Sequence, residues 1–128
     1  MATQGNTWLK QPAIADIVQT AIRYGDGRSY TLHAYCIMPN HVHLLVTILS
    51  QRVSFTRVLQ SLKGFSARQA NALLNRTGQP FWQAESYDHV VRNADEFNRI
   101  VSYILHNPVK AGLVSEWEEY PYSYVANL

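Results

Sequence analysis

Apolar residues recur at two different spacings along the chain, and the spacing separates helices from strands. Between residues 11 and 24 they recur every three or four positions, and Pro12 suits the first turn of a helix. Residues 29–37 and 41–49 are instead rich in β-branched, aromatic and other apolar side chains, and the Met-Pro-Asn sequence at 38–40 is typical of a turn between them. We therefore expect a helix followed by a β-hairpin.

The helical spacing returns twice in the second half of the chain. A long helix is expected over residues 54–74, with a serine at its N-cap, and another over residues 93–106, with the capping-box spacing of Asn and Glu at its start. The Asn-Pro pair at 107–108 is expected to end that helix, and residues 86–92 suit a short strand. The order helix, strand, strand, helix, strand, helix predicts a single α+β domain over residues 1–128, with helices packed on an antiparallel sheet.

Composition limits the class of protein. The chain has 128 residues, of which 47% are hydrophobic and 16% are charged, and this balance supports a packed core. No stretch approaches the roughly 20 apolar residues of a membrane span, so no membrane partner is expected. Cys36 is the single cysteine, which excludes an internal disulfide and a multi-cysteine zinc site. We expect a reducing, cytoplasmic setting.

Acidic residues are missing from the middle of the chain. The segment between Asp26 and Glu85 contains none, and its basic residues are Arg28, Arg52, Arg57, Lys63, Arg68 and Arg76. The net charge of +2 therefore hides a purely cationic block, which is typical of a surface that binds a polyanion. A solvated helix face with its charge partners elsewhere in the fold is the alternative interpretation.

Two histidines stand on one face of the second expected strand. Residues two apart in a strand point the same way, so His41 and His43 project together. The opposite face carries the apolar residues Val42, Leu44, Val46 and Ile48. The histidines therefore face away from the main core. Two imidazoles on a rigid strand can hold a divalent metal ion, and two hydrogen-bonded surface histidines are the alternative.

A tyrosine and an asparagine share one strip of the last expected helix. Tyr103 and Asn107 are four positions apart, so they are neighbours on the helix surface. A tyrosine hydroxyl can act as a nucleophile, and an amide oxygen can bind a metal ion. The ordinary alternative is a tyrosine at the rim of the core with its hydroxyl in water.

Three sequence blocks, in order, resemble a known family. They are AYCIMPNHVHLL at residues 34–45, FWQ at 81–83 followed by YDHVVR at 87–92, and YILHNPVKAGLV at 103–114. This series closely resembles the IS200-like single-tyrosine transposases and, within them, the REP-associated tyrosine transposases. The resemblance runs from about residue 8 to residue 123.

The resemblance implies a metal-dependent HUH endonuclease that cleaves and rejoins single-stranded DNA. By position, His41 and His43 match the metal-binding pair of the family. Tyr103 matches the nucleophile that forms a 5′-phosphotyrosine link, and Asn107 lies where such families place a third metal ligand. The implied cofactor is Mg²⁺ or Mn²⁺, and the implied partner is hairpin DNA with an adjoining single-stranded cleavage site, as in DNA transposition and recombination.

The cationic block contains the residues that we expect to contact this DNA. Phosphates are expected to meet Arg57, Lys63 and Arg68. Unpaired bases are expected to stack on Phe65 or Trp82.

Family members usually begin with an additional strand within a ferredoxin-like sheet, beside the strand of the histidine pair. Residues 1–10 have poor strand character here, so the expected ferredoxin-like sheet lacks that first strand. Unpaired backbone groups would then remain at the sheet, and an open edge favours a second chain. A homodimer is therefore expected.

Other functions remain compatible with the sequence. The main alternative is a non-catalytic nucleic-acid-binding remnant of this family that keeps the basic helix. An unrelated metal hydrolase would use His41 and His43 without Tyr103. The sequence does not decide whether His89 or His106 takes part.

Overall fold

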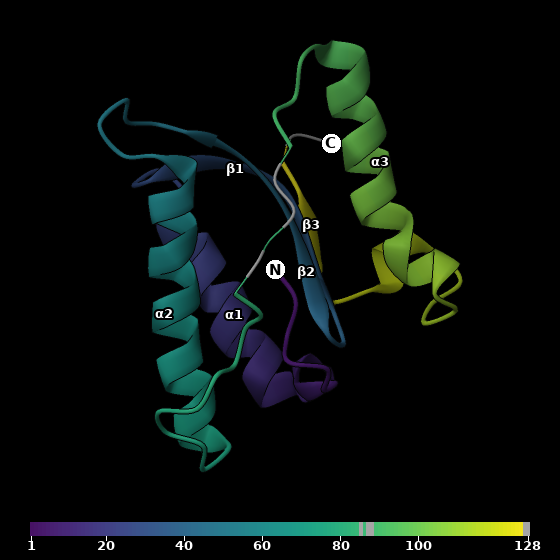
Figure 1. Cartoon of the computed structure of the whole chain (residues 1–128). Coiled ribbons are helices and arrows are strands. Elements are labelled where there is room, and N and C mark those ends of the chain that lie inside the picture. The colour runs from purple at the N-terminus through teal and green to yellow at the C-terminus, as the bar shows by residue number, and fades with distance from the viewer. Residues whose placement is uncertain (85, 87–88, 127–128) are drawn as a thin grey trace.

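Three helices flank a three-stranded antiparallel sheet in the computed structural model, which describes residues 1–84, 86 and 89–126 (Figure 1). The main elements are α1 (Pro12–Gly25), β1 (Tyr30–Met38), β2 (His41–Ile48), α2 (Phe55–Leu73), α3 (Ala94–Lys110) and β3 (Ser123–Val125). Two short 3₁₀ helices, η1 (Trp8–Lys10) and η2 (Trp117–Glu119), precede α1 and β3. The expected α+β class with an antiparallel sheet is confirmed. Within the described part of the chain, no helix is long and apolar enough to cross a membrane.

β1 is the central strand, and the order across the sheet is β2-β1-β3. The expected hairpin forms between β1 and β2, with Met38 opposite His41 and Cys36 opposite His43. The register shifts between Leu32 and Ala34, which inserts one additional residue into β1. Between this bulge and the hairpin turn the alternation of side chains is regular, so the register determines the face on which the two histidines lie.

The first residues of the chain lie along the outer side of β2. The backbone of Met1 accepts a hydrogen bond from the amide of Val42 at 2.7 Å, and its amino group donates to the Val42 carbonyl at 3.1 Å. Ala2 forms an isolated bridge with His41, and Thr3 forms another with Trp82. The described residues before α1 form no strand. This extended segment nevertheless pairs with part of the β2 edge, which was expected to remain unpaired because the first strand of the family is missing.

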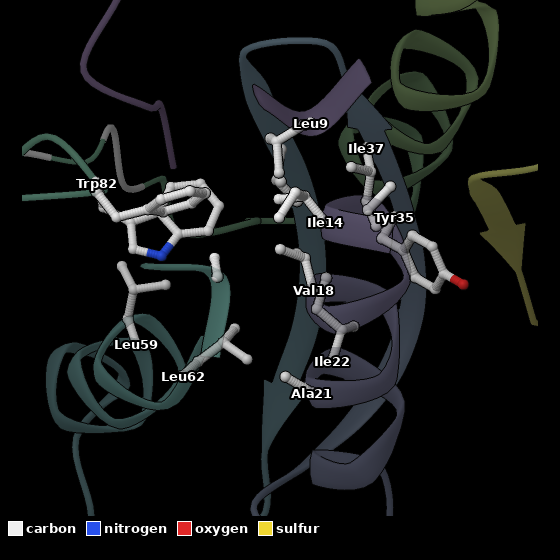
Figure 2. Packing of buried hydrophobic residues seen from close by; sticks show 14 of the residues in the cluster. Leu9, Ile14, Val18, Ala21, Ile22, Tyr35, Ile37, Leu59, Leu62 and Trp82 are labelled. Carbon is white, nitrogen blue, oxygen red and sulfur yellow. The ribbon is translucent and has the colours of Figure 1, made fainter. Parts of the chain in front are cut away.

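The two faces of the sheet bury separate apolar clusters. The larger cluster lies between the sheet and helices α1 and α2, and Figure 2 shows its members Leu9, Ile14, Val18, Ile22, Tyr35, Ile37, Leu59 and Leu62. The smaller cluster lies between the sheet and α3 and consists of Ala34, Cys36, Met38, Leu45 and Ile104. The apolar face of β2 packs into the larger cluster, so the histidines of β2 face α3, as its alternation predicts.

Both expected helix caps are present. The Ser54 hydroxyl accepts a hydrogen bond from the Arg57 amide at 3.2 Å, and the Asn93 side chain accepts one from the Glu96 amide at 2.9 Å. These caps satisfy backbone donors that the first turn of a helix leaves without partners. The beginnings of α2 and α3 are therefore determined by local sequence.

The expected end of the last helix is wrong. α3 continues through Pro108 to Lys110 instead of ending at the Asn-Pro pair. A proline removes one intrahelical hydrogen bond, but Pro108 lies in the last turn and its side chain is fully buried. Packing of the ring therefore offsets the missing bond, and α3 ends four residues after residue 106, the expected end.

The third strand is also in a different place from the expected one. Residues 86 and 89–92 form no strand, and residues 87–88 of that expectation lie outside the described residues. The third strand is instead β3, which pairs with β1 so that Ala34 faces Val125. Three residues are too few to show the period-two alternation from which strands are predicted.

Candidate functional site

A cleft of about 860 Å³ opens between β2, α2 and α3. Its floor is the stretch of β2 from residue 41 to 45, and Phe55 and Leu59 of α2 form one wall. Ile100, Tyr103 and Ile104 of α3 contribute the opposite wall. Apolar walls beside a short row of polar groups are typical of a binding site.

The two histidines of β2 meet at the end of this cleft nearest the hairpin turn. Their ring centroids are 4.8 Å apart and the rings are nearly perpendicular, at 85°. Nδ1 of His41 lies 2.8 Å from Oδ1 of Asn40, which fixes the orientation of that ring. The side chains of His41 and His43 therefore converge, as expected for two residues that share one face of a strand.

α3 brings the predicted tyrosine and asparagine to the same point. The Tyr103 ring lies edge-on to His43 with 5.3 Å between centroids, and the residue remains 55% exposed. Nδ2 of Asn107, one turn later, lies 2.9 Å from Nε2 of His43. The structure thus brings together four residues that the sequence selects from two segments about 60 positions apart.

Burial keeps the histidine pair uncharged. The pKa of His43 is lowered to about 4, first by burial and then by repulsion from His41 and from the amino group of Met1. Burial, followed by the same amino group, also lowers the pKa of His41. Neutral imidazole is the form that binds metal ions, so both rings are in the ligating state at neutral pH.

The donor set fits a divalent ion that accepts nitrogen and oxygen ligands. Among the described residues, no group of three or more His, Cys, Asp or Glu side chains could hold a metal ion, so a third side-chain ligand beside His41 and His43 has to be of another type. The Asn107 amide is such a group, and turning it by half a rotation presents its oxygen in place of the nitrogen near His43. Two imidazoles and an amide oxygen suit Mg²⁺ or Mn²⁺ with open positions for substrate.

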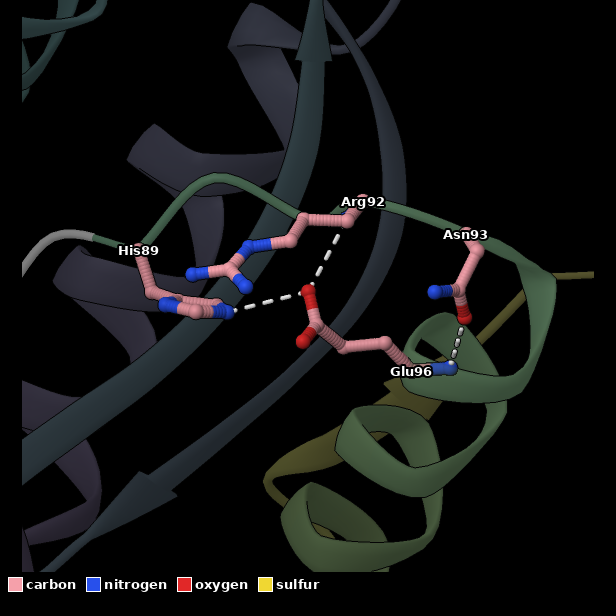
Figure 3. Close-up of polar contacts among 4 residues, drawn as sticks. All are labelled: His89, Arg92, Asn93 and Glu96. Atoms are coloured by element: carbon pink, nitrogen blue, oxygen red, sulfur yellow. Dashed lines mark hydrogen bonds and ion pairs between the residues drawn. The ribbon is translucent and has the colours of Figure 1, made fainter.

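A carboxylate ties the segment before α3 to the helix (Figure 3). Oε1 of Glu96 accepts a hydrogen bond from the Arg92 amide at 2.9 Å and lies 3.0 Å from Nε2 of His89. The bond from Arg92, and then the one from His89, lower the pKa of the Glu96 carboxyl. His89 and Glu96 both line the cleft, so His89 belongs to its wall and is held there by Glu96.

His106 lies outside the residues that line the cleft. Its Nδ1 lies 2.9 Å from the carbonyl oxygen of Ser102 on the same helix. Of the two histidines that the sequence leaves undecided, His89 therefore lines the cleft and His106 does not.

Three of the residues expected to contact DNA lie on the outer surface of α2. Arg57 and Arg68 are exposed and eleven residues apart, which is about three helical turns, so they share one face. Phe65, 44% exposed, lies beside them. The cleft is lined by a different face of α2, through Phe55 and Leu59, so the basic face and the cleft are separate surfaces.

The other two expected contacts have structural roles in this arrangement. Nζ of Lys63 donates to the carbonyl of Gln83 at 2.9 Å. Trp82 is only 7% exposed, its indole donates to Oγ of Ser66 at 3.0 Å, and its ring faces α2 in Figure 2. A base has no access to a ring enclosed in this way, so we leave Trp82 out of the surface proposed below.

Two charged residues of the cleft were not selected from the sequence. Glu96 and Arg99 line it together with Tyr103. Their spacing from Tyr103, seven and four positions, places them on the same side of a helix and could have identified them.

Comparisons with known proteins identify the family of this chain. Residues 6–107 match the family model described as "Transposase IS200 like". A Haemophilus influenzae protein, provisionally named a REP-associated tyrosine transposase, is 30% identical over 98 residues, which are 70% of this chain and 56% of the relative. The REP-associated tyrosine transposase of Escherichia coli K12 is 28% identical over 102 residues, 80% of this chain and 58% of that protein. The chain thus spans little more than half the length of these relatives.

A solved structure has the same fold. It is described as a REP-associated tyrosine transposase bound to a REP hairpin, and it is similar with a TM-score of 0.75 and 22% identity, over 95% of this chain and 72% of the other. The family model covers most of this chain, including His41, His43, Tyr103 and Asn107. The resemblance seen in the three sequence blocks is therefore confirmed, and the chain belongs to the IS200-like transposase family.

Proposed function

We propose that this protein cleaves and rejoins single-stranded DNA beside a hairpin, with Tyr103 as the nucleophile. One observation carries the proposal: Tyr103 and Asn107 of α3 meet the His41–His43 pair of β2 at one end of a cleft. A neutral histidine pair, an amide and an accessible hydroxyl together supply the groups needed for transfer of a phosphodiester to a tyrosine.

The chemistry needs a group that withdraws charge from the phosphate. His41, His43 and Asn107 would hold Mg²⁺ or Mn²⁺, which supplies this Lewis acidity when bound. The Tyr103 oxygen attacks phosphorus and loses its proton, and the bond to the 3′ oxygen breaks. The products are a 5′-phosphotyrosine and a free 3′-hydroxyl, and attack by a 3′-hydroxyl on the phosphotyrosine reverses the step and rejoins a strand.

The hairpin is proposed to bind the outer face of α2. Arg57 and Arg68 can contact phosphates, and Phe65 can stack on an unpaired base. Lys63 lies on a different side of α2, where its amino group donates to the carbonyl of Gln83, so it is left out of this face. The solved relative that is bound to a REP hairpin supports the choice of hairpin DNA.

The proposal is tested with a labelled hairpin oligonucleotide that carries a single-stranded extension, incubated with Mn²⁺ and separated on a denaturing gel. A covalent protein–DNA adduct is expected, and Tyr103→Phe is expected to abolish it because only the hydroxyl is removed. Tyr24→Phe is the matched control, since Tyr24 is also exposed, at 67%, and lies at the end of α1. An adduct that persists in Tyr103→Phe would contradict the assignment of the nucleophile.

A second function is supported by the separation of the two surfaces. Because the basic face of α2 does not line the cleft, hairpin binding can persist without chemistry in a non-catalytic member of the family. Binding that is lost in Arg57→Ala and Arg68→Ala, with no adduct on any of several hairpins, would favour this alternative. Metal-dependent DNA hydrolysis that Tyr103→Phe leaves unchanged would instead indicate an unrelated metal hydrolase.

The predicted homodimer is also open to measurement. β2 offers an edge that Met1 and Ala2 pair with only near the hairpin turn, and unpaired strand edges favour association. Light scattering is expected to give the mass of two chains, and a monomer over a wide concentration range would contradict this prediction.

A further inference from the structure

We propose that Arg99 binds the phosphate next to the one that Tyr103 attacks and thereby positions the DNA strand in the cleft. The inference rests on the proposed function and adds a positioning residue to it. The sequence blocks that identify the family do not contain Arg99, so the assignment comes from its place in the structure.

Arg99 and Tyr103 lie on the same side of α3. They are four residues apart, which is about one turn and about 6 Å along the helix axis. Both line the cleft whose floor carries the histidine pair. Successive phosphates along one DNA strand are separated by a distance of the same order, so a strand that presents one phosphate to Tyr103 can present the next to Arg99.

Among the described residues, the charges around the cleft leave Arg99 available for a phosphate. The ionisable groups that line the cleft in the described part of the chain are His41, His43, His89, Glu96, Arg99, Tyr103 and the amino group of Met1. Glu96 is the one carboxylate among them, and its Oε1 is engaged by His89 and by the Arg92 amide (Figure 3). The described residues include no carboxylate in ion-pair contact with Arg99.

The chemistry of the side chain fits this role. A guanidinium stays charged at all relevant pH values and can donate two parallel hydrogen bonds to a phosphate. Arg99 therefore supplies a permanent positive charge one turn from the proposed nucleophile.

The test measures binding rather than turnover, in a Tyr103→Phe background that prevents cleavage. Anisotropy gives the affinity for a hairpin with a single-stranded extension and for the same hairpin without it, over a series of salt concentrations. Arg99→Gln is expected to weaken binding of the extended DNA by about tenfold and to reduce the slope of log K against log salt by about 0.7, the value for one contact to a single strand. Binding of the hairpin alone is expected to stay the same.

Two further variants separate a phosphate contact from a structural effect. Arg99→Lys keeps the charge, so it is expected to restore the salt slope but only part of the affinity. Arg28→Gln removes an exposed arginine that precedes β1, at the end of the hairpin opposite His41, and is expected to leave the effect of the extension unchanged. Equal losses for both DNAs in Arg99→Gln, or no loss for either, would overturn the proposal.

A modified DNA identifies the phosphate. A neutral methylphosphonate replaces one phosphate of the extension at a time, and the affinity of each DNA is measured with and without Arg99→Gln. When the phosphate next to the scissile one is replaced, Arg99→Gln is expected to cause no further loss of affinity, because both changes remove the same interaction. At every other position the two losses are expected to add. Additive effects at every position would contradict the assignment. If the unmodified enzyme forms no adduct while the extension still binds through Arg99, the proposed catalysis fails and the strand-binding role stands.

Discussion

The two faces of the sheet are covered in different ways. On the face of α1 and α2, large apolar side chains form the main cluster, and buried residues recur on every turn of α1. On the face of α3, the sheet presents Ala34, Cys36, Met38 and Leu45 to Ile104, and Leu105 and Pro108 of α3 are buried as well. The first face therefore carries the larger apolar cluster, whereas α3 and its tyrosine pack on the smaller cluster of the other face.

This difference bears on how the site is built. The histidines belong to the hairpin, whose strand β2 packs its other face on the larger cluster. Tyr103 and Asn107 belong to the helix that packs on the smaller cluster, and the hydrogen bond between Asn107 and His43 connects the two parts at the site itself. Changes on the α1 and α2 face are therefore expected to act on the whole fold, and changes on the α3 face to act first on the geometry of the site.

The largest effect is expected on the α1 and α2 face. Ile14 is 1% exposed in the larger cluster, so Ile14→Ala removes buried contacts and leaves a cavity. We expect the free energy of unfolding to fall by about 3 kcal/mol, measured by urea denaturation. Leu73→Ala is the control, because Leu73 lies on α2 but is largely exposed, and an equal loss there would contradict the role assigned to burial.

A smaller and more local effect is expected on the α3 face. Ile104→Ala removes a buried side chain that packs α3 on the sheet, in a cluster with partly exposed neighbours, and is expected to lower the free energy of unfolding by about 2 kcal/mol. The hydrogen-exchange rate of the α3 amides is expected to increase more than that of the α1 amides. The covalent adduct at Tyr103 is expected to form more slowly. Uniform exchange across both helices would show that the two faces unfold together and would remove the contrast between them.

The two helix caps allow a matched pair of substitutions, each of which is expected to lower the free energy of unfolding by about 1 kcal/mol. Ser54→Ala affects the start of α2, and Asn93→Ala affects the start of α3. Both are expected to lower the thermal midpoint, but only Asn93→Ala is expected to weaken adduct formation, because α3 carries Tyr103. Equal activity in both variants would indicate that the start of α3 does not influence the position of the tyrosine.

The smallest effect is expected at Glu96 and depends on pH. The pKa of this carboxyl is lower in the folded chain than in the unfolded one, so its contribution to stability is present above the ordinary glutamate pKa and is lost as the pH falls through the lowered value. Glu96→Gln is expected to lose this contribution at neutral pH and to show a weaker fall of the thermal midpoint on acidification. Parallel pH profiles for the two proteins would contradict the bonds from Arg92 and His89.

Local signals explain which parts of the fold could be predicted. The hairpin has a turn sequence between two strands, and the alternation of β2 fixes the face on which His41 and His43 lie. The caps at Ser54 and Asn93 mark two helix starts through side-chain chemistry within four residues. These features follow from neighbouring residues, and the structure agrees with each of them.

The features that the sequence did not predict depend on contacts between distant segments. β3 is only three residues long and exists because it pairs with β1. Pro108 stays in α3 because its ring is buried, and burial is decided by packing partners elsewhere in the chain. Trp82 could be identified as an aromatic residue near the site, but its enclosure by α2 could not be inferred from its neighbours.

Tyr103 and Asn107 sit on a single rigid rod, one turn apart. Any tilt or slide of α3 moves the proposed nucleophile and the proposed amide ligand as one body, and preserves the spacing between them while it changes their distance to the two imidazoles. The proposed metal affinity and the proposed reactivity of the tyrosine would therefore change together. A partner or a DNA strand that displaces α3 on the apolar cluster around Ile104 would therefore change both properties at once.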